Sequence, residues 1–145
     1  MSDTDIEYYR AIDILERIEH ERIKKHIPVT KFSKLLGNCY AYWSVKYASA
    51  NIPRVQTLNK MAKILDVNIY YLIYGHEYGP FKEYDIDLKR IPEYTARHNY
   101  FITGSQKSTI SRIKHGKQID IGMQMFFAIE EKIQKNLFKI ITNNC

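Results

Sequence analysis

Apolar residues recur at three- and four-residue spacing along this chain, as they do on the buried face of an α-helix. Ile12, Leu15 and Ile18 form such a stripe in the first segment, and Pro28 ends it. In the first half of the chain the pattern predicts helices over residues 5–26, 30–36 (with Phe32, Leu35 and Leu36 facing inward), 39–48, from Pro53 through Leu65, and from Asn68 to just before Gly75. The fold class that we expect is therefore all-α.

Residues 76–87 interrupt this pattern with a Gly79-Pro80 break and an excess of acidic residues, 4 Asp and Glu against 1 Lys. Glycine and proline together punctuate helical segments, and an acidic polar stretch is typical of solvated chain. We expect a linker here, which separates a first domain of residues 1–75 from a second unit of residues 88–145.

The second unit begins less regularly than the first. Pro92 falls where its first helix should continue, so that helix is short, kinked or begins at Pro92. Asn99 and Tyr100 make the next predicted helix irregular. The segment from Met123 to Ile141 is strongly apolar. It is interpreted either as a homodimer interface or as the closing core helix of the unit.

A short polar helix is predicted over residues 105–115, between Gly104 and Gly116. Ile110 and Ile113 are three residues apart, so they share one buried face of that helix. The other side carries residue types that hydrogen-bond base edges and phosphates, namely Gln106, Lys107, Ser108 and Arg112. The helix is therefore a candidate for contact with nucleic acid.

The same frame of residues occurs 67 positions earlier in the chain. The matched pairs are Gly37 with Gly104, Trp43 with Ile110, Ser44 with Ser111, and Ser49 with Gly116. A repeat of this length indicates two copies of one supersecondary unit.

The frame Gly104, Ile110-Ser111, Ile113 and Gly116 resembles the recognition helix of the Cro/phage-repressor (Xre-type) helix-turn-helix family. The stretch from Pro53 through Leu65, followed by Tyr71-Leu72 and Gly75, is similar to the C-terminal half of a domain of that family. The resemblance implies a lambda-repressor-like helix-turn-helix bundle in residues 1–75 and a second, divergent helix-turn-helix unit in residues 88–145. The alternative for the first domain is a generic five-helix bundle.

Residue by residue, the resemblance implies a set of DNA contacts in each unit. In the second unit these are Gln106, Lys107, Ser108, Thr109, Arg112, Lys114 and Lys117; in the first they are Asn38, Tyr40, Tyr42 and Lys46. The residues at the start of the helix would meet base edges, with Gln suited to adenine and Lys to guanine. Thr109 would touch a thymine methyl or a phosphate. The alternative for each residue is that it belongs to a solvated polar helix face and contacts no DNA.

The first unit departs from the family where its reading helix should be. Cys39, Tyr40, Ala41 and Tyr42 stand at the reading positions and carry few donors, and Lys46 stands where the family has a hydrophobic residue. An aromatic surface of this kind also suits the docking of a protein.

Charge adds to the case for nucleic acid. The chain has a net charge of +6, and residues 88–145 carry 10 Lys and Arg against 4 Asp and Glu. The excess lies with the stronger recognition-helix candidate, and a basic domain attracts polyanions. The alternative is an inert basic surface.

Other classes are disfavoured by what the sequence lacks. Cys39 and Cys145 are the only cysteines and the five histidines are scattered, so we expect no zinc site, no structural disulfide and no cofactor. No catalytic motif is present, so we expect no enzyme. No run of eighteen apolar residues occurs and the N-terminus opens on polar residues, so we expect no membrane span and a cytoplasmic location.

Two hypotheses follow. The first is a sequence-specific, double-stranded DNA-binding transcription regulator of bacterial or phage type, acting as a homodimer. The second is an interaction protein, such as an antitoxin or a phage-encoded inhibitor, that keeps the helix-turn-helix scaffold and binds a protein partner.

Overall fold

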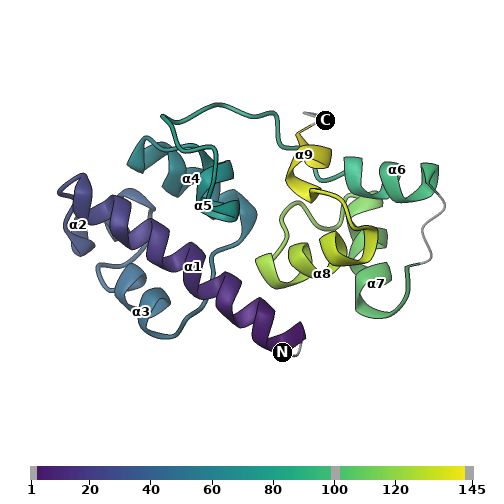
Figure 1. Cartoon of the computed structure of the whole chain (residues 1–145), viewed down its shortest axis with the longest axis horizontal. Coiled ribbons are helices and arrows are strands. Elements are labelled where there is room, and N and C mark those ends of the chain that lie inside the picture. The colour runs from purple at the N-terminus through teal and green to yellow at the C-terminus, as the bar shows by residue number, and fades with distance from the viewer. Residues whose placement is uncertain (1–2, 99–101, 143–145) are drawn as a thin grey trace. The chain divides into compact units, whose positions relative to one another are not determined.

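The computed structural model describes residues 3–98 and 102–142, and this part of the chain is helical without any strand (Figure 1). The expected all-α fold class is thereby confirmed. The helices are α1 (Asp3–Lys24), α2 (Val29–Leu35), α3 (Tyr42–Ala48), α4 (Val55–Leu65), α5 (Ile69–Tyr74), α6 (Arg90–Arg97), α7 (Gly104–Lys114), α8 (Met123–Ile133) and α9 (Leu137–Ile141). The chain divides into two compact units between Lys82 and Glu83, a point that lies inside the segment predicted as a linker.

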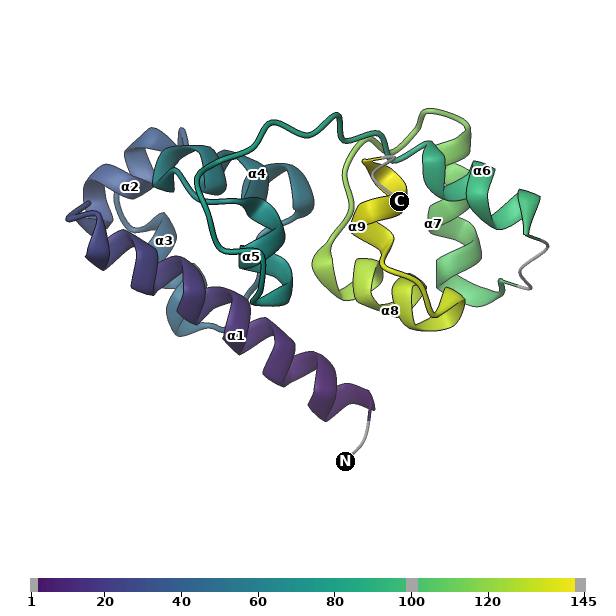
Figure 2. The same ribbon diagram turned by 45° about the horizontal axis from the view of Figure 1, so that its top comes forward.

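Unit 1 buries the apolar stripes that the sequence pattern identifies. Its core includes Ile14 and Ile18 from α1 and Leu58, Met61 and Leu65 from α4, all fully buried. The first helix packs against α4 and α5, and α2 packs against α3; Figure 2 shows α1 lying alongside α5. Burial of these aliphatic side chains is the main force that holds the helices together, because α2 to α5, with 6 to 11 residues each, are too short to be stable alone.

Two details of unit 1 differ from the pattern-based expectation. Leu35 was expected inside, but it is exposed at the last position of α2. The third helix begins at Tyr42 rather than at Cys39, because residues 39–41 form a turn closed by a hydrogen bond from the Tyr42 amide to the Cys39 carbonyl (3.0 Å). No side chain caps α3. The side-chain nitrogen of Asn38, Nδ2, donates instead to the Leu36 carbonyl (3.2 Å).

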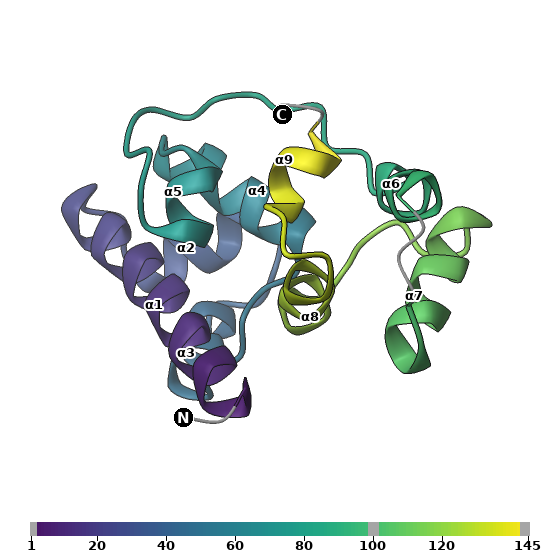
Figure 3. The same ribbon diagram turned by 45° about the vertical axis from the view of Figure 1, so that its right-hand side comes forward.

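Unit 2 is built from α6 to α9. Of the three expectations for its first helix, the short form is observed: α6 begins at Arg90, and Pro92 is its third residue. Proline is tolerated there because the first-turn N–H groups have no partner inside a helix. The sixth helix packs against α7 and α9, and α8 packs against α9, as Figure 3 shows. The irregularity expected at Asn99 and Tyr100 lies outside the described residues.

The apolar segment from Met123 to Ile141 forms two helices rather than one. The chain breaks at Gln134, which has φ 52°, and Asn136 and Glu130 cap α9 by accepting from the Lys139 and Leu137 amides (3.0 Å each). Its buried side chains are Met123, Phe126, Phe127, Ile129, Ile133, Leu137, Phe138, Ile140 and Ile141. These residues are buried in the single chain, so they leave no exposed apolar face, and the homodimer remains a prediction without that support.

Within residues 3–98 and 102–142, no helix combines the length and apolarity that a membrane span requires.

Candidate nucleic-acid interface

The seventh helix has the form that the sequence predicts, to within one residue. It begins at Gly104 and ends at Lys114, and it is followed by Gly116 with φ +73°. The Gly116 amide donates to the Ile113 carbonyl (3.1 Å) and the Lys117 amide to the Arg112 carbonyl (2.8 Å). These two bonds satisfy carbonyls that a helix end otherwise leaves without donors, and the positive φ is why a glycine suits this position.

The inward side of α7 is wider than expected. Ile110 and Ile113 are buried as predicted, and Thr109 is buried with them. The prediction that Thr109 contacts DNA is therefore wrong. Thr109 lies four residues before Ile113, so it falls on the same helix face. Its hydroxyl oxygen accepts a hydrogen bond from Arg112 Nη2 at 3.2 Å.

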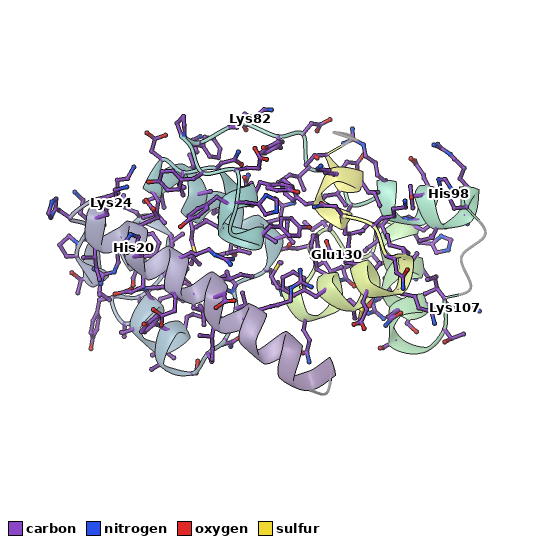
Figure 4. The ribbon with its side chains drawn as sticks, in the orientation of Figure 1. His20, Lys24, Lys82, His98, Lys107 and Glu130 are labelled. Atoms are coloured by element: carbon purple, nitrogen blue, oxygen red, sulfur yellow. The ribbon has the colours of Figure 1, made fainter. Side chains whose placement is uncertain are left out.

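The outward side of α7 and of the turn that follows it is polar and cationic. Its exposed members include Lys107, Ser108, Ser111, Arg112, Lys114 and Lys117, and Gln106 is half-buried. Figure 4 shows Lys107 extending from α7 away from the other helices of its unit. The predicted residues of this unit thus lie on the outward side of α7 or in the turn after it. Thr109 is the exception, because it lies on the inward side.

Arg112 is held in place by its neighbours. Besides the bond to Thr109, its Nε donates to Gln118 Oε1 at 3.1 Å, and Gln118 Nε2 donates in turn to the Asp120 carbonyl at 2.8 Å. Sequence reasoning missed Gln118 because it lies beyond the helix, outside any helical period. The available signal was Gly116, since a left-handed residue there turns the chain back along α7.

The third helix, the counterpart of α7 in unit 1, is anchored by Trp43, which is 1% exposed. Its backbone amide donates to Ser33 Oγ (3.0 Å), its indole Nε1 donates to Glu19 Oε2 (2.5 Å), and its ring meets Phe32 edge to face with centroids 5.5 Å apart. The Glu19 carboxylate also pairs with Arg22. Hydrogen bonding to Arg22 and then to Trp43 lowers the pKa of Glu19, although partial burial opposes this shift.

The outward side of α3 is largely uncharged. Tyr40 in the preceding turn is 75% exposed and Val45 is 62% exposed. Lys46 is the one charged residue of the segment Tyr42–Ala48, and its ammonium lies 5.7 Å from the centroid of the Tyr42 ring. Tyr42 is half-buried, and this burial raises its pKa. These two predicted contact residues therefore face each other.

The other two predicted residues of unit 1 lie elsewhere. Asn38 and Tyr40 line an open hollow of about 480 Å³ together with Thr30, Lys31 and Lys34 of α2. The structure therefore divides the predicted set of unit 1 between the Tyr42–Lys46 pair and this hollow.

The two frames do not coincide residue for residue. Ala50, with φ 54°, takes the place of Gly116, because its amide and that of Asn51 donate to Tyr47 and Lys46. The offset at the helix ends is therefore 66 residues, and the expected match of Ser49 with Gly116 is wrong. At the other end, Gly37 closes α2, whereas Gly104 is the first residue of α7.

Among the described residues, no three His, Cys, Asp or Glu side chains are grouped so that they could hold a metal ion.

Comparisons with known protein families, with curated proteins and with solved structures found no match for this chain.

Proposed function

We propose that this chain is a sequence-specific, double-stranded DNA-binding transcription regulator of the helix-turn-helix class, of bacterial or phage type, and that α7 is its reading helix. The observation that carries the proposal is the division of α7 into two sides. Ile110, Ile113 and Thr109 are buried, while Lys107, Ser108 and the cations after them face solvent. Amides, hydroxyls and cations on an exposed helix are the groups that contact base edges and phosphates.

The residues of α7 take different roles in this proposal. Gln106, Lys107 and Ser108 lie in the first half of the helix, the part of a reading helix that meets base edges. Lys107 donates to the O6 and N7 acceptors of guanine. Arg112 and Lys114 contact the phosphate backbone. Because Arg112 is already held by Thr109 and Gln118, less side-chain entropy is lost when it binds.

Selection of bound duplexes from a random pool, followed by fluorescence anisotropy on the selected site, tests the proposal. We expect Lys107→Ala to weaken binding by roughly 5- to 150-fold and to relax the preference at one position, since one base contact contributes about 1–3 kcal/mol. Lys132→Ala on α8 removes the same charge from another exposed position and serves as the matched control.

Two results would count against the proposal. One is a pool from which the intact chain enriches no sequence, and the other is identical binding by the Lys107→Ala and Lys132→Ala variants. The same selection also tests the homodimer, because a symmetric dimer selects a palindromic site whereas a single chain does not.

One observation favours a second candidate function, the binding of a protein partner. Val45 is a large exposed aliphatic side chain on α3, where a DNA-reading helix would carry donors, and the Tyr40 ring is exposed in the turn before it. Aromatic and aliphatic side chains of this kind are enriched at protein interfaces. Under this alternative, unit 1 binds the protein partner. The Lys107→Ala variant would then bind that partner as the wild-type chain does, and the wild-type chain would bind no duplex.

A further inference from the structure

The hollow in unit 1 is a second cationic surface, separate from α7. Thr30, Lys31 and Lys34 come from α2, and Asn38 and Tyr40 come from the turn that leads into α3. Both lysines are exposed, and neither has an ion-pair partner in the part of the chain that the structure describes. Two positive charges thus share one open hollow with side chains that carry hydroxyl and amide groups.

The helix beside this hollow is poorly equipped to read bases. The outward positions of α3 include Val45 and Ala48, and its one cation, Lys46, lies against the Tyr42 ring. The exposed Ser44 and Tyr47 hydroxyls already donate to the Ala41 carbonyl and to the Glu16 carboxylate. Base pairs are told apart by donors and acceptors in the major groove, which aliphatic side chains do not provide apart from contact with a thymine methyl. Lysine ammonium groups and hydroxyls suit phosphate oxygens, whose recognition is independent of sequence.

We infer that this hollow binds the phosphodiester backbone of duplex DNA, so that unit 1 holds the DNA without reading it while α7 reads it. The inference rests on the function proposed above and adds a division of labour between the two units. Lys31 and Lys34 supply the charge, and the Thr30 and Tyr40 hydroxyls are donors at its edge. Because the units share one chain, even a weak backbone contact raises the overall affinity through effective concentration.

An acidic protein segment is negatively charged like a phosphate, so it is the other candidate occupant of this hollow. We favour DNA because each of the five lining residues carries a hydroxyl, an amide or an ammonium group, and because the exposed aliphatic side chains of unit 1 nearest in sequence, Leu35 and Val45, are not part of the lining. A docking site for protein is expected to have an apolar centre with a polar rim. This hollow has cations and hydroxyls in its lining instead.

The test compares two double variants of the intact chain, Lys31→Ala/Lys34→Ala in the hollow and Lys60→Ala/Lys63→Ala on α4. Both remove two exposed positive charges from unit 1, so the long-range field changes equally. The observable is the slope of log K against log salt concentration, measured on the selected duplex and on a scrambled one. We expect the hollow variant to reduce the slope by about 2 and to weaken both duplexes by the same factor, because each lost phosphate contact lowers the slope by about 1. The control should leave the slope near that of the wild type.

A third variant, Lys31→Arg/Lys34→Arg, keeps both charges and is expected to restore the slope. Equal slopes for the hollow variant and its α4 control would overturn the inference and leave the hollow to an acidic protein segment. That outcome differs from failure of the proposed function, in which the wild-type chain itself binds no duplex. Far-UV circular dichroism on each variant verifies that the helices are intact.

Discussion

The third and seventh helices stand at corresponding places in the sequence repeat, but they are attached to their units by different chemistry. The third helix is held by one large aromatic residue, Trp43, whose amide and indole nitrogens both donate hydrogen bonds. The seventh is held by the buried side chains of Ile110, Ile113 and Thr109, none of which is titratable.

The outward sides of the two helices also differ. The third helix exposes Val45 and places its one cation against a tyrosine ring, whereas α7 exposes Lys107, Arg112 and Lys114. A buried side of either kind is enough to place a short helix, so the anchor says little about function. The outward side is free of packing requirements, and the two units can therefore differ in what they bind.

The largest expected effect concerns the anchors. Trp43→Ala should destabilise unit 1 by about 3–5 kcal/mol, because it removes a fully buried ring and leaves the Glu19 carboxylate without its indole donor. Ile113→Ala should cost unit 2 about 2–5 kcal/mol. Urea denaturation followed by far-UV circular dichroism measures both, and Val45→Ala is the exposed control with a change within about 0.5 kcal/mol. A Trp43→Ala variant as stable as that control would refute the anchoring role.

The next effect concerns how Arg112 is positioned. Thr109→Val keeps the buried volume but removes the hydroxyl acceptor, so we expect duplex affinity to fall several-fold while stability changes by about 0.5–1.5 kcal/mol. Arg112→Lys keeps the charge but loses the fork that reaches Thr109 and Gln118. Anisotropy on both single variants and the double variant gives the coupling. Strictly additive losses would contradict positioning through Thr109.

A smaller effect is expected when α3 is given a cation. Val45→Lys should increase the affinity for all duplexes alike and steepen the salt slope by at most about 1, because a point charge contacts phosphate without discriminating bases. The selected sequence should stay the same. A changed sequence preference would mean that α3 itself lies in a groove, and the contrast between the two helices would then fail. Tyr40→Ala provides a second check, since loss of sequence preference in that variant would also make unit 1 a reader.

The smallest effect is a pH dependence confined to unit 1. The pKa of Glu19 is lowered in the folded state by Arg22 and Trp43. A carboxyl of this kind stabilises the fold above its unfolded-state pKa, and the stabilisation is lost as pH falls through the lower folded-state pKa. We therefore expect the urea midpoint of unit 1 to fall below about pH 4, the ordinary range of a glutamate, and Glu19→Gln to reduce that dependence. An unchanged acid profile in Glu19→Gln would contradict the assignment.

The sequence predicted the helices and the buried stripes well, because helical periodicity reports directly which side of a segment is apolar. It placed Ile110 and Ile113 inside and nearly all of α7 at its observed bounds. The prediction was wrong for Thr109, a small polar side chain that can be either buried or exposed. Thr109 is compatible with either side of a helix, and the i, i+4 relation to Ile113 decides that it is inside.

Other features of the site depend on contacts that no local pattern encodes. The Gln118–Arg112 bond forms because the chain reverses after Gly116. The hollow between α2 and the following turn arises from side-chain packing in three dimensions. Leu35 was misassigned for a related reason, since α2 ends there and its last residue is left without a neighbouring element to cover it.

The most direct test of the central claim is an NMR titration of the intact, isotopically labelled chain with a selected duplex, following backbone amide shifts. The account predicts the largest changes at the amides of residues 105–108 and 111–112, on the outward side of α7, with smaller changes around Lys31 and Lys34. Saturable duplex binding that leaves the α7 amides unchanged would contradict the account, because the duplex would then be bound by some other surface.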